Sequence, residues 1–389
     1  MRDPHSRSAG GAPYSMLFVS MGCAALTLLL SACSADMPVQ REAQPAEQGA
    51  LSVAYSIVCV IHGDGDYLYH DTSGIDYRAD EEAVAGAKRV AQQNPHAEVF
   101  IFHQRPRRHL LFVFALRDGD FYYYRNGRLT ANASYWRDDQ EISHFDPEVG
   151  LYRRFRADNQ REMVRLFLYY GHEIPEFGGA GYDASYPDRP FTVRDFAGGL
   201  KDFTRDFERF DLMVLSTCFG GTPHTIGALG PFTRYIIASP DNLHLSYFDL
   251  HPLEQLDLSL RDRDVPAFAK QFAHQAFDRL TGDIQTAVSV AVYDVDRVQK
   301  FLRSVSPAYD HMLATLKGET YASTAMLEHC DCADLPAYVL PAMTEGVNVL
   351  YRPPRFGRSK HKQNHSGWEC WREKGAQTGT SQSTEPDLK

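Results

Sequence analysis

The sequence predicts an α/β fold whose central sheet is mostly parallel. Segments with the composition of buried strands alternate with segments of helical periodicity along much of the chain. Two of the buried runs end in a reactive residue, because residues 163–171 lead into His172 and residues 209–217 lead into Cys218. Strand–helix–strand connections are right-handed crossovers, which bring the carboxyl ends of parallel strands to one edge of a sheet.

The individual elements are predicted from apolar runs, helical spacing and turn residues. The expected strands are 51–62, 98–103, 163–171, 209–217, 234–239, 286–293 and 346–351. The expected helices are 80–93 with Asp80 as N-cap, 148–160, 192–207 opening at Thr192, a turn or helix over 222–230, 266–280 and 295–316. A hairpin is expected between 110–115 and 121–125, around the turn at 117–120.

Composition excludes some classes of function. The chain has 389 residues, is 43% hydrophobic and 23% charged, and carries a net charge of −10, which suits one large or two modest globular domains. This acidic balance, without a long basic run, argues against a nucleic-acid partner. The sequence contains no phosphate-binding loop and no Gly-x-Ser-x-Gly elbow, so nucleotide enzymes and serine hydrolases have no support.

The amino terminus has the pattern of an export signal. Residues 16–32 are nearly uncharged and fall short of the ~20 residues that a spanning helix needs. Leu30–Cys33 resembles the bacterial lipoprotein box, which implies cleavage before Cys33 and lipid on that residue. A plain signal peptide or a short membrane anchor is the alternative. Ser34 after the cysteine favours the outer membrane or cell surface, and the polar residues up to 49 form a tether.

The pairing of Cys218 with His172 has a chemical reason. A thiolate is the nucleophilic form of cysteine, and an ordinary thiol with a pKa of about 8.5 is mostly protonated at neutral pH. An imidazole beside it can take the proton and later return it to a leaving amine. Each residue alone is better explained as a small buried side chain or an ordinary histidine. Their matched places at strand ends favour a catalytic dyad.

The order of these elements resembles the clostripain family of cysteine peptidases, relatives of caspases, gingipains and legumains. The resemblance runs from about Leu51 to about Trp371 and includes the segments 235–239, 286–294, 346–351 and 367–368. It implies a caspase-like three-layer sandwich with a mostly parallel sheet and a C-terminal α+β extension. It also implies an endopeptidase that acts on a peptide or protein without a cofactor.

The terminal patterns and the resemblance together assign parts of the chain, and the resemblance assigns roles. The expected parts are a signal peptide (1–32), a tether (33–49), a catalytic domain (50–255), a C-terminal subdomain (256–373) and a disordered tail (374–389). His172 would be the general base and acid, and Cys218 the nucleophile. The backbone amides of Glu173 and Cys218 would form the oxyanion hole.

Two positions depart from the family pattern. Glu173 follows the histidine where the family has glycine, and Ser216 stands where clostripain has an aspartate that binds a basic side chain. We expect Ser216 to favour neutral or small side chains, with Asp241 as the alternative source of a carboxylate in the specificity pocket. The same departures support an alternative function, an inactive binding or scaffold lipoprotein with this fold.

Other candidate residues have simpler interpretations. The His62-Gly63 pair is best explained as a structural turn. Cys330, Cys332 and Cys370 favour a disulfide over free thiols, and zinc, with His361 and His365 as further ligands, ranks third, so no metal is expected. The basic residues between 352 and 362 form a solvated loop, with contact to anionic lipid or cell-wall polymer as the alternative.

Overall fold

The computed structural model describes residues 40–41, 52–64, 68–70, 76–111, 113–137, 145–157, 163–176, 183, 185–243, 248–256, 260–304 and 346–357. Residues Arg41–Lys389 form one compact unit. Within the described ranges, no helix combines the length and apolar character that crossing a membrane requires.

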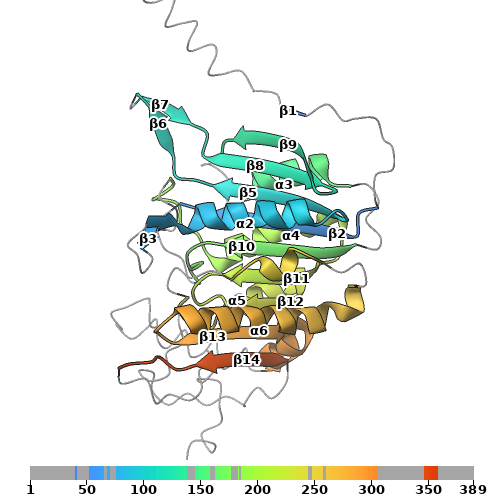
Figure 1. Cartoon of the computed structure of the whole chain (residues 1–389), viewed down its shortest axis with the longest axis vertical. Coiled ribbons are helices and arrows are strands. Elements are labelled where there is room, and N and C mark those ends of the chain that lie inside the picture. The colour runs from blue at the N-terminus through green and yellow to red at the C-terminus, as the bar shows by residue number, and fades with distance from the viewer. Residues whose placement is uncertain are drawn as a thin grey trace, which may run out of the picture. The chain divides into compact units, whose positions relative to one another are not determined.

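A large mixed sheet forms the centre of the molecule (Figure 1). Its strands are β2 (Tyr55–His62), β5 (Ala97–Gln104), β8 (Gly119–Arg125), β9 (Arg128–Tyr135), β10 (Val164–Tyr170), β11 (Phe210–Ser216), β12 (Thr233–Ala238), β13 (Val288–Asp294) and β14 (Val347–Arg352). They lie in the order β9-β8-β5-β2-β10-β11-β12-β13-β14. The five central strands are parallel, and the outer pairs are antiparallel. The predicted α/β class with a mostly parallel sheet is therefore confirmed.

Helices cover both faces of this sheet. They are α2 (Ala79–Gln93), α3 (Asp146–Phe155), α4 (Val193–Phe203), α5 (Pro223–Leu229) and α6 (Val265–Asp283), and residues 295–304 are also helical. Helices α2 and α6 lie in front of the sheet in Figure 1, and α3, α4 and α5 lie behind it. The result is a three-layer sandwich around a mostly parallel sheet, as the resemblance implies.

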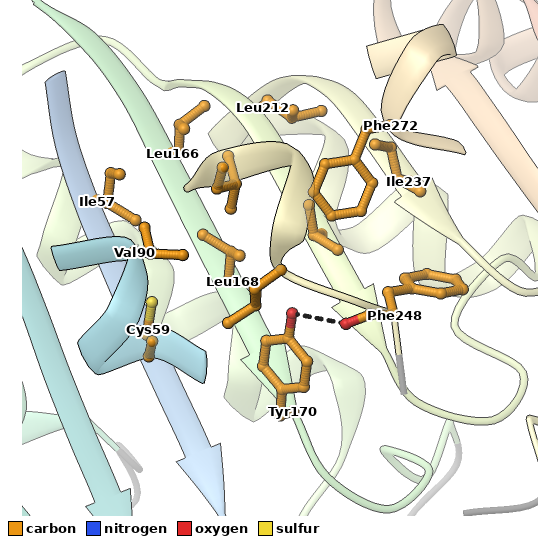
Figure 2. Close-up of a cluster of buried hydrophobic side chains, with 14 of the residues drawn as sticks. Ile57, Cys59, Val90, Leu166, Leu168, Tyr170, Leu212, Ile237, Phe248 and Phe272 are labelled. Carbon is orange, nitrogen blue, oxygen red and sulfur yellow. Dashed lines mark hydrogen bonds between the residues drawn. The ribbon is translucent and has the colours of Figure 1, made fainter. Parts of the chain in front are cut away.

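The core is mainly aliphatic on one side of the sheet and aromatic on the other. Aliphatic side chains from alternate strand positions pack against α2 and α6, and Figure 2 shows Leu168 and Val90 among them. On the other side the packing is aromatic, with Phe167 and Phe196 at 6.2 Å and Phe102 and Phe203 at 6.4 Å between ring centroids. Strands buried on both faces explain why the sequence shows continuous apolar runs there.

Strands on both sides of residue 256 belong to the same sheet. β13 pairs with β12, β14 pairs with β13, and α6 contributes Phe272 and Ala276 to the aliphatic core. The predicted C-terminal α+β extension therefore continues the sheet that β2 begins.

The predicted hairpin between 110–115 and 121–125 is wrong. β8 instead pairs with β9 across Asn126 and Gly127, whose φ angles of 52° and 78° are those of a tight two-residue turn. Residues 108–116 form a separate small hairpin, β6 (Arg108–Leu110) with β7 (Phe114–Leu116). A further pair, β3 (Leu68–His70) with β4 (Asp76–Arg78), and the two-residue strand β1 (Gln40–Arg41) complete the strands.

Of the two predicted helix N-caps, Thr192 is confirmed and Asp80 is wrong. Thr192 caps α4 and forms a reciprocal capping box with Asp195, as its position before the helix indicates. Asp80 is not the N-cap of α2, because the helix begins after Arg78. The Asp80 carboxylate is buried and accepts a hydrogen bond from His103 Nε2 at 2.9 Å. Burial opposes its ionisation, but His103 and Arg78 outweigh burial and lower the pKa of this carboxyl.

Candidate active site

The strands that carry the histidine and the cysteine are neighbours. β10 and β11 pair in parallel with Leu168 opposite Val214 and Tyr170 opposite Ser216. The pairing continues beyond the strands, because Gly171 N donates to Ser216 O at 3.3 Å and Thr217 Oγ1 donates to His172 O at 2.8 Å. The segments that contain His172 and Cys218 therefore leave the sheet side by side at its carboxyl edge. A contact between imidazole and thiol stays a prediction.

The thiol of Cys218 lies against the loop that follows β12. Its Sγ donates to Asn242 Oδ1 at 3.1 Å and accepts from Leu243 N at 3.4 Å. The side chain is half-buried, unlike that of Cys59 in β2, which is fully buried and whose pKa rises to about 12 because burial disfavours the thiolate. The Cys218 thiol is the more accessible one.

The turn after Cys218 is constrained by close packing. Phe219 has φ of 51°, an uncommon angle for a residue with a Cβ, and its N–H donates to Asp241 O at 3.1 Å. A Cβ on Gly221 would lie 2.4 Å from Tyr293 Oη and 2.9 Å from Pro240 N, so only glycine fits. Gly221 is thus explained by the approach of the β12–β13 region.

A buried carboxylate links the loop after His172 to the turn after Cys218. Glu176 accepts hydrogen bonds from Thr222 Oγ1 and, at 3.3 Å, from Thr225 Oγ1. Thr222 also caps α5, because its Oγ1 accepts from Thr225 N at 3.2 Å. Together with the bond between Thr217 and the His172 carbonyl, these contacts fix the two segments relative to each other.

The predicted specificity residues lie near this edge but differ in exposure. Ser216 is 5% exposed, and its Oγ accepts from Phe248 N at 2.8 Å. Asp241 is half-buried, and its Oδ1 accepts from Asn242 N at 2.8 Å. Glu173, half-buried, directly follows His172. The hydroxyl of Ser216 thus already has a backbone partner, and the carboxylate of Asp241 lies in the loop that contacts the thiol.

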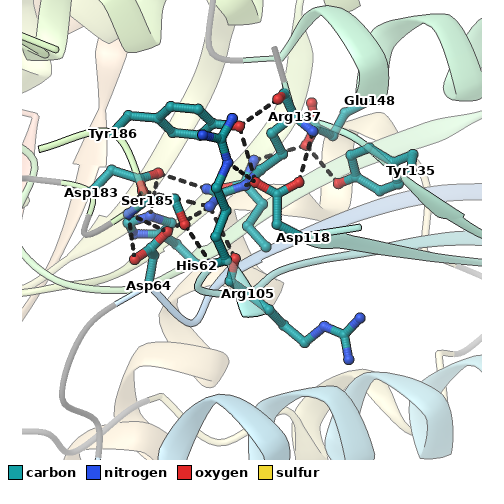
Figure 3. Close-up of polar contacts among 12 residues, drawn as sticks. His62, Asp64, Arg105, Asp118, Tyr135, Arg137, Glu148, Asp183, Ser185 and Tyr186 are labelled. Atoms are coloured by element: carbon teal, nitrogen blue, oxygen red, sulfur yellow. Dashed lines mark hydrogen bonds and ion pairs between the residues drawn. The ribbon is translucent and has the colours of Figure 1, made fainter. Parts of the chain in front are cut away.

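A buried charge network anchors the same edge on the β2 side (Figure 3). The Arg137 guanidinium donates to Asp183 Oδ2 at 2.6 Å and to Asp64 Oδ2 at 2.5 Å, and its Nε lies 3.4 Å from Asp118 Oδ2. His62 Nε2 lies 3.3 Å from Asp183 Oδ2. All five side chains are buried. His62 is thereby placed in a structural network.

Asp183 and Asp64 in this network have opposite pKa shifts. Burial acts to raise the pKa of Asp183, but hydrogen bonds from His62 and Asp64 and the charge of Arg137 hold it far below its ordinary value. Burial and the neighbouring Asp183 raise the pKa of Asp64 despite Arg137. The arrangement keeps Asp183 ionised while Asp64 holds its proton more tightly.

This network also contains the residues that come closest to a metal site. One ligand atom each from His62, Asp64 and Asp183 lie within 4.8 Å of one another. However, the Arg137 guanidinium already bonds both carboxylates at 2.5 and 2.6 Å, so a cation occupies the position that a metal would need. We assign these residues to an ion-pair cluster.

Sequence reasoning missed Asn242, Glu176 and Arg137. Their partners lie 24, 46 and 46 residues away in the chain, so no local pattern indicates them. The available signal was positional, since Glu176 and Asn242 both follow a predicted strand that ends at the reactive edge. Several predicted residues lie outside the described ranges, namely Cys33, Cys330, Cys332, His361, His365 and Cys370.

The layers and strand order define a three-layer α/β protein with a mostly parallel central sheet. The chain is similar to a secreted C11 cysteine protease from Bacteroides thetaiotaomicron, with 12% identity and a TM-score of 0.46 over 67% of this chain and 72% of that one. It is also similar to a secreted C11 cysteine protease from Bacteroides thetaiotaomicron in complex with an irreversible peptide inhibitor, with 11% identity and a TM-score of 0.44 over 67% of this chain and 70% of that one.

A second neighbour is an inactive zymogen C11 protease from Parabacteroides distasonis, with 14% identity and a TM-score of 0.42 over 75% of this chain and 72% of that one. C11 is the clostripain family, the one that the sequence resembles. No family model and no curated protein matched the chain. At these identities the likeness concerns the fold.

Proposed function

We propose that the chain is a cysteine endopeptidase in which His172 and Cys218 form the catalytic dyad. The observation that carries this proposal is the parallel register of β10 and β11, which continues through the bond between Thr217 Oγ1 and the His172 carbonyl. A half-buried thiol at that edge, next to a histidine-bearing segment, is the geometry that covalent acyl transfer needs.

The proposed reaction has two halves. His172 takes the thiol proton, Cys218 Sγ bonds to the substrate carbonyl carbon, and the carbonyl electron pair moves to the oxygen, which the amides of Glu173 and Cys218 would hold. The C–N bond then breaks, and the imidazolium gives its proton to the leaving amine. Water, deprotonated by His172, attacks the thioester and releases the acid, and Cys218 regains a proton.

A peptide-based thiol-reactive probe tests this function. Wild-type protein should form one covalent adduct at Cys218 and hydrolyse peptides from a mixed library. Cys218→Ala should lose both, and Cys59→Ala, which removes a buried thiol in the middle of β2, should retain both. A wild-type protein that binds peptides without cleaving them would instead support the inactive binding lipoprotein.

For specificity we propose a preference for neutral or small side chains. The absence of charge at Ser216, whose hydroxyl accepts from Phe248 N, supports this preference, because a buried guanidinium without a counter-charge costs several kcal/mol. The half-buried Asp241 is the competing source of charge. Strict cleavage after Arg or Lys that is lost in Asp241→Asn would overturn the preference.

We also propose that the protein is exported and lipid-anchored through Cys33. The Leu30–Cys33 sequence supports this, and the neighbouring solved structures include a secreted protease. Cys33→Ser should abolish labelling by radioactive fatty acid and release the protein from the membrane fraction. Unchanged labelling would refute lipidation at Cys33.

A further inference from the structure

Exposed apolar side chains concentrate on one small element, the β6–β7 hairpin (residues 108–116). Leu110 is 55% exposed, Leu111 73%, Val113 75% and Leu116 40%. Only two other large apolar side chains in the described ranges are comparably exposed, Trp136 and Phe356. Single exposed apolar residues are ordinary, but a cluster at the tip of one element indicates an interaction surface.

Trp136 lies beside the base of this hairpin. Tyr135 is opposite Gly119 in the β8–β9 pairing, and Arg137 N donates to Asp118 Oδ1 at 2.9 Å. Asp118 follows β7 by only one residue. Five of the six exposed large apolar side chains therefore belong to one corner of the molecule.

The same segment is basic in an acidic chain. Residues 105–117 include four arginines and one histidine and contain no Asp or Glu, although the whole chain carries a net charge of −10. Arg108 and His109 are exposed on β6, directly before the apolar tip. Apolar and cationic groups are thus combined on one projecting element.

The hairpin projects from a fixed base. Figure 1 shows β6 and β7 extending away from the main sheet. Below them Arg105 N donates to Asp118 O at 2.7 Å, and Arg107 N donates to Ser185 Oγ at 2.7 Å. The guanidinium of Arg137 donates to Arg105 O at 3.0 Å, which connects the hairpin to the buried charge network. The tip is therefore presented by an anchored support.

The turn at the tip has an apolar residue in a backbone conformation that is uncommon for it. Leu111 has φ of 53°, a region where glycine and asparagine are favoured and leucine is uncommon. The sequence places leucine there nevertheless, and its side chain is the second most exposed of the set. Leucine at this position strains the backbone and adds nothing to the core. A contact of its side chain with another molecule would explain why it is there.

We propose that the β6–β7 hairpin inserts its apolar tip into a bilayer surface that contains anionic lipid. The order along the hairpin, with leucine and valine at the tip and arginine and tryptophan toward the base, matches the order of hydrocarbon, interface and phosphate in a membrane. A few side chains at a tip also provide much less area than the ~800 Å² per partner of a stable protein interface. A bilayer, which needs only local insertion, fits this surface better than a protein does.

Membrane contact at this hairpin would orient the candidate active site. The hairpin directly follows β5, and β5, β2, β10 and β11 are parallel, so it extends from the same carboxyl edge that carries His172 and Cys218. The lipid proposed on Cys33 would be a separate attachment to the same membrane. The hairpin contact itself depends neither on peptidase activity nor on that lipid.

Flotation with vesicles tests this contact. The chain is expressed from Arg41 to Lys389, which is one compact unit that contains the whole described core and lacks residues 16–33, whose own apolar stretch would bind vesicles. It should float with vesicles of phosphatidylethanolamine and phosphatidylglycerol. The double variant Leu111→Ser, Val113→Ser should lose about tenfold or more of this binding.

Matched variants distinguish vesicle binding by the hairpin tip from nonspecific hydrophobic binding. Phe356→Ser removes an equally exposed apolar side chain, 61% exposed, beyond β14 at the opposite end of the sheet, and should leave flotation unchanged. Arg108→Glu should weaken binding to anionic vesicles and leave binding to phosphatidylcholine vesicles unchanged. Thermal melts should coincide for all variants, because the altered side chains are exposed.

Three kinds of result would overturn the proposal. The first is a flotation result: either the wild-type chain does not float, or the Phe356→Ser variant loses as much binding as the double variant. The second is a double variant that floats normally but cleaves a protein substrate poorly, which would make the hairpin a substrate contact. The third is a wild-type dimer that the double variant converts to a monomer without any change in flotation.

Discussion

The two described cysteines should react very differently. Cys59 is fully buried with a pKa raised to about 12, whereas the Cys218 thiol is half-buried at the carboxyl edge. At pH 7 to 8 iodoacetamide should modify Cys218 in the native protein, and Cys59 only after denaturation. Peptide mapping by mass spectrometry measures this. Equal modification of both cysteines in the native protein would contradict the described packing.

Asn242 should control the ionisation of Cys218. Its Oδ1 accepts from the thiol, and rotation of the amide would let Nδ2 donate to the thiolate. Asn242→Asp keeps the shape but places a carboxylate near the sulfur, so the thiol pKa should rise and alkylation at pH 7 should slow by about tenfold or more. Asn348→Asp adds the same charge on the exposed face of β14 and should not change the rate. Equal rates in wild type and Asn242→Asp would refute this role.

Residue patterns could place His172 and Cys218 at the ends of buried strands but could not indicate their neighbours. His172 and Cys218 each end an apolar run, and such an end is visible in the sequence. Asn242, Glu176 and Arg137 act on partners from other elements, which only the folded chain brings near. The position of Ser216 near the strand end could be predicted from the sequence. Its hydrogen bond with Phe248 N could not, because the two residues are 32 positions apart.

At the level of elements, Thr222 connects α5 to the loop after His172. Thr222→Val removes the cap of α5 and one hydrogen bond to buried Glu176, so stability should fall by about 1 to 3 kcal/mol and peptide hydrolysis should fall with it. Thr192→Val removes the cap of α4, costs about 1 kcal/mol and should leave hydrolysis unchanged. Urea unfolding and initial rates measure both. If both variants lose hydrolysis in proportion to stability, Thr222 acts only as a cap.

Element types could be predicted better than element pairing. The long strands are recognisable because burial on both faces produces a continuous apolar run. The helices are recognisable because burial on one face produces a helical period of apolar residues. The turn residues at 117–120 predict the wrong hairpin, because the tight turn is formed by Asn126 and Gly127, which have positive φ angles. Asp80 looked like a cap, yet its carboxylate is used by His103 from the neighbouring strand.

For the whole molecule, the buried network around Arg137 should account for most of the decrease in the free energy of unfolding at acidic pH. Asp183→Asn removes a buried charge partner of Arg137 and His62, and the free energy of unfolding at pH 7 should fall by about 3 to 5 kcal/mol. Asp206→Asn breaks the partly exposed pair with Arg156 and should cost less than about 1 kcal/mol.

The pH dependence of this effect has a definite sign. The pKa of Asp183 is lower in the folded chain than the unfolded value of about 3.9, so its stabilisation is complete above that value and is lost as pH falls toward the folded pKa. The difference between wild type and Asp183→Asn should therefore be constant from pH 7 to about 5 and shrink below about 4. Urea unfolding across this range measures it, and a difference that grows on acidification would contradict the assignment.

The parallel centre of the sheet follows from the alternation of strands and helices, but the width of the sheet does not. Right-handed crossovers predict a parallel centre, and that centre is present. Antiparallel strands β13 and β14 extend the sheet on one side and β8 and β9 on the other, and local periodicity carries no information about these partners.

The dyad itself is tested most directly by the pH dependence of Cys218 alkylation in wild type and in His172→Ala. If the imidazole pairs with the thiol, the wild-type rate should reach half its maximum well below pH 8, because the imidazolium stabilises the thiolate. In His172→Ala the midpoint should move to about 8.5 or above, the range of an unassisted thiol. Superimposable profiles would show that His172 does not act on Cys218.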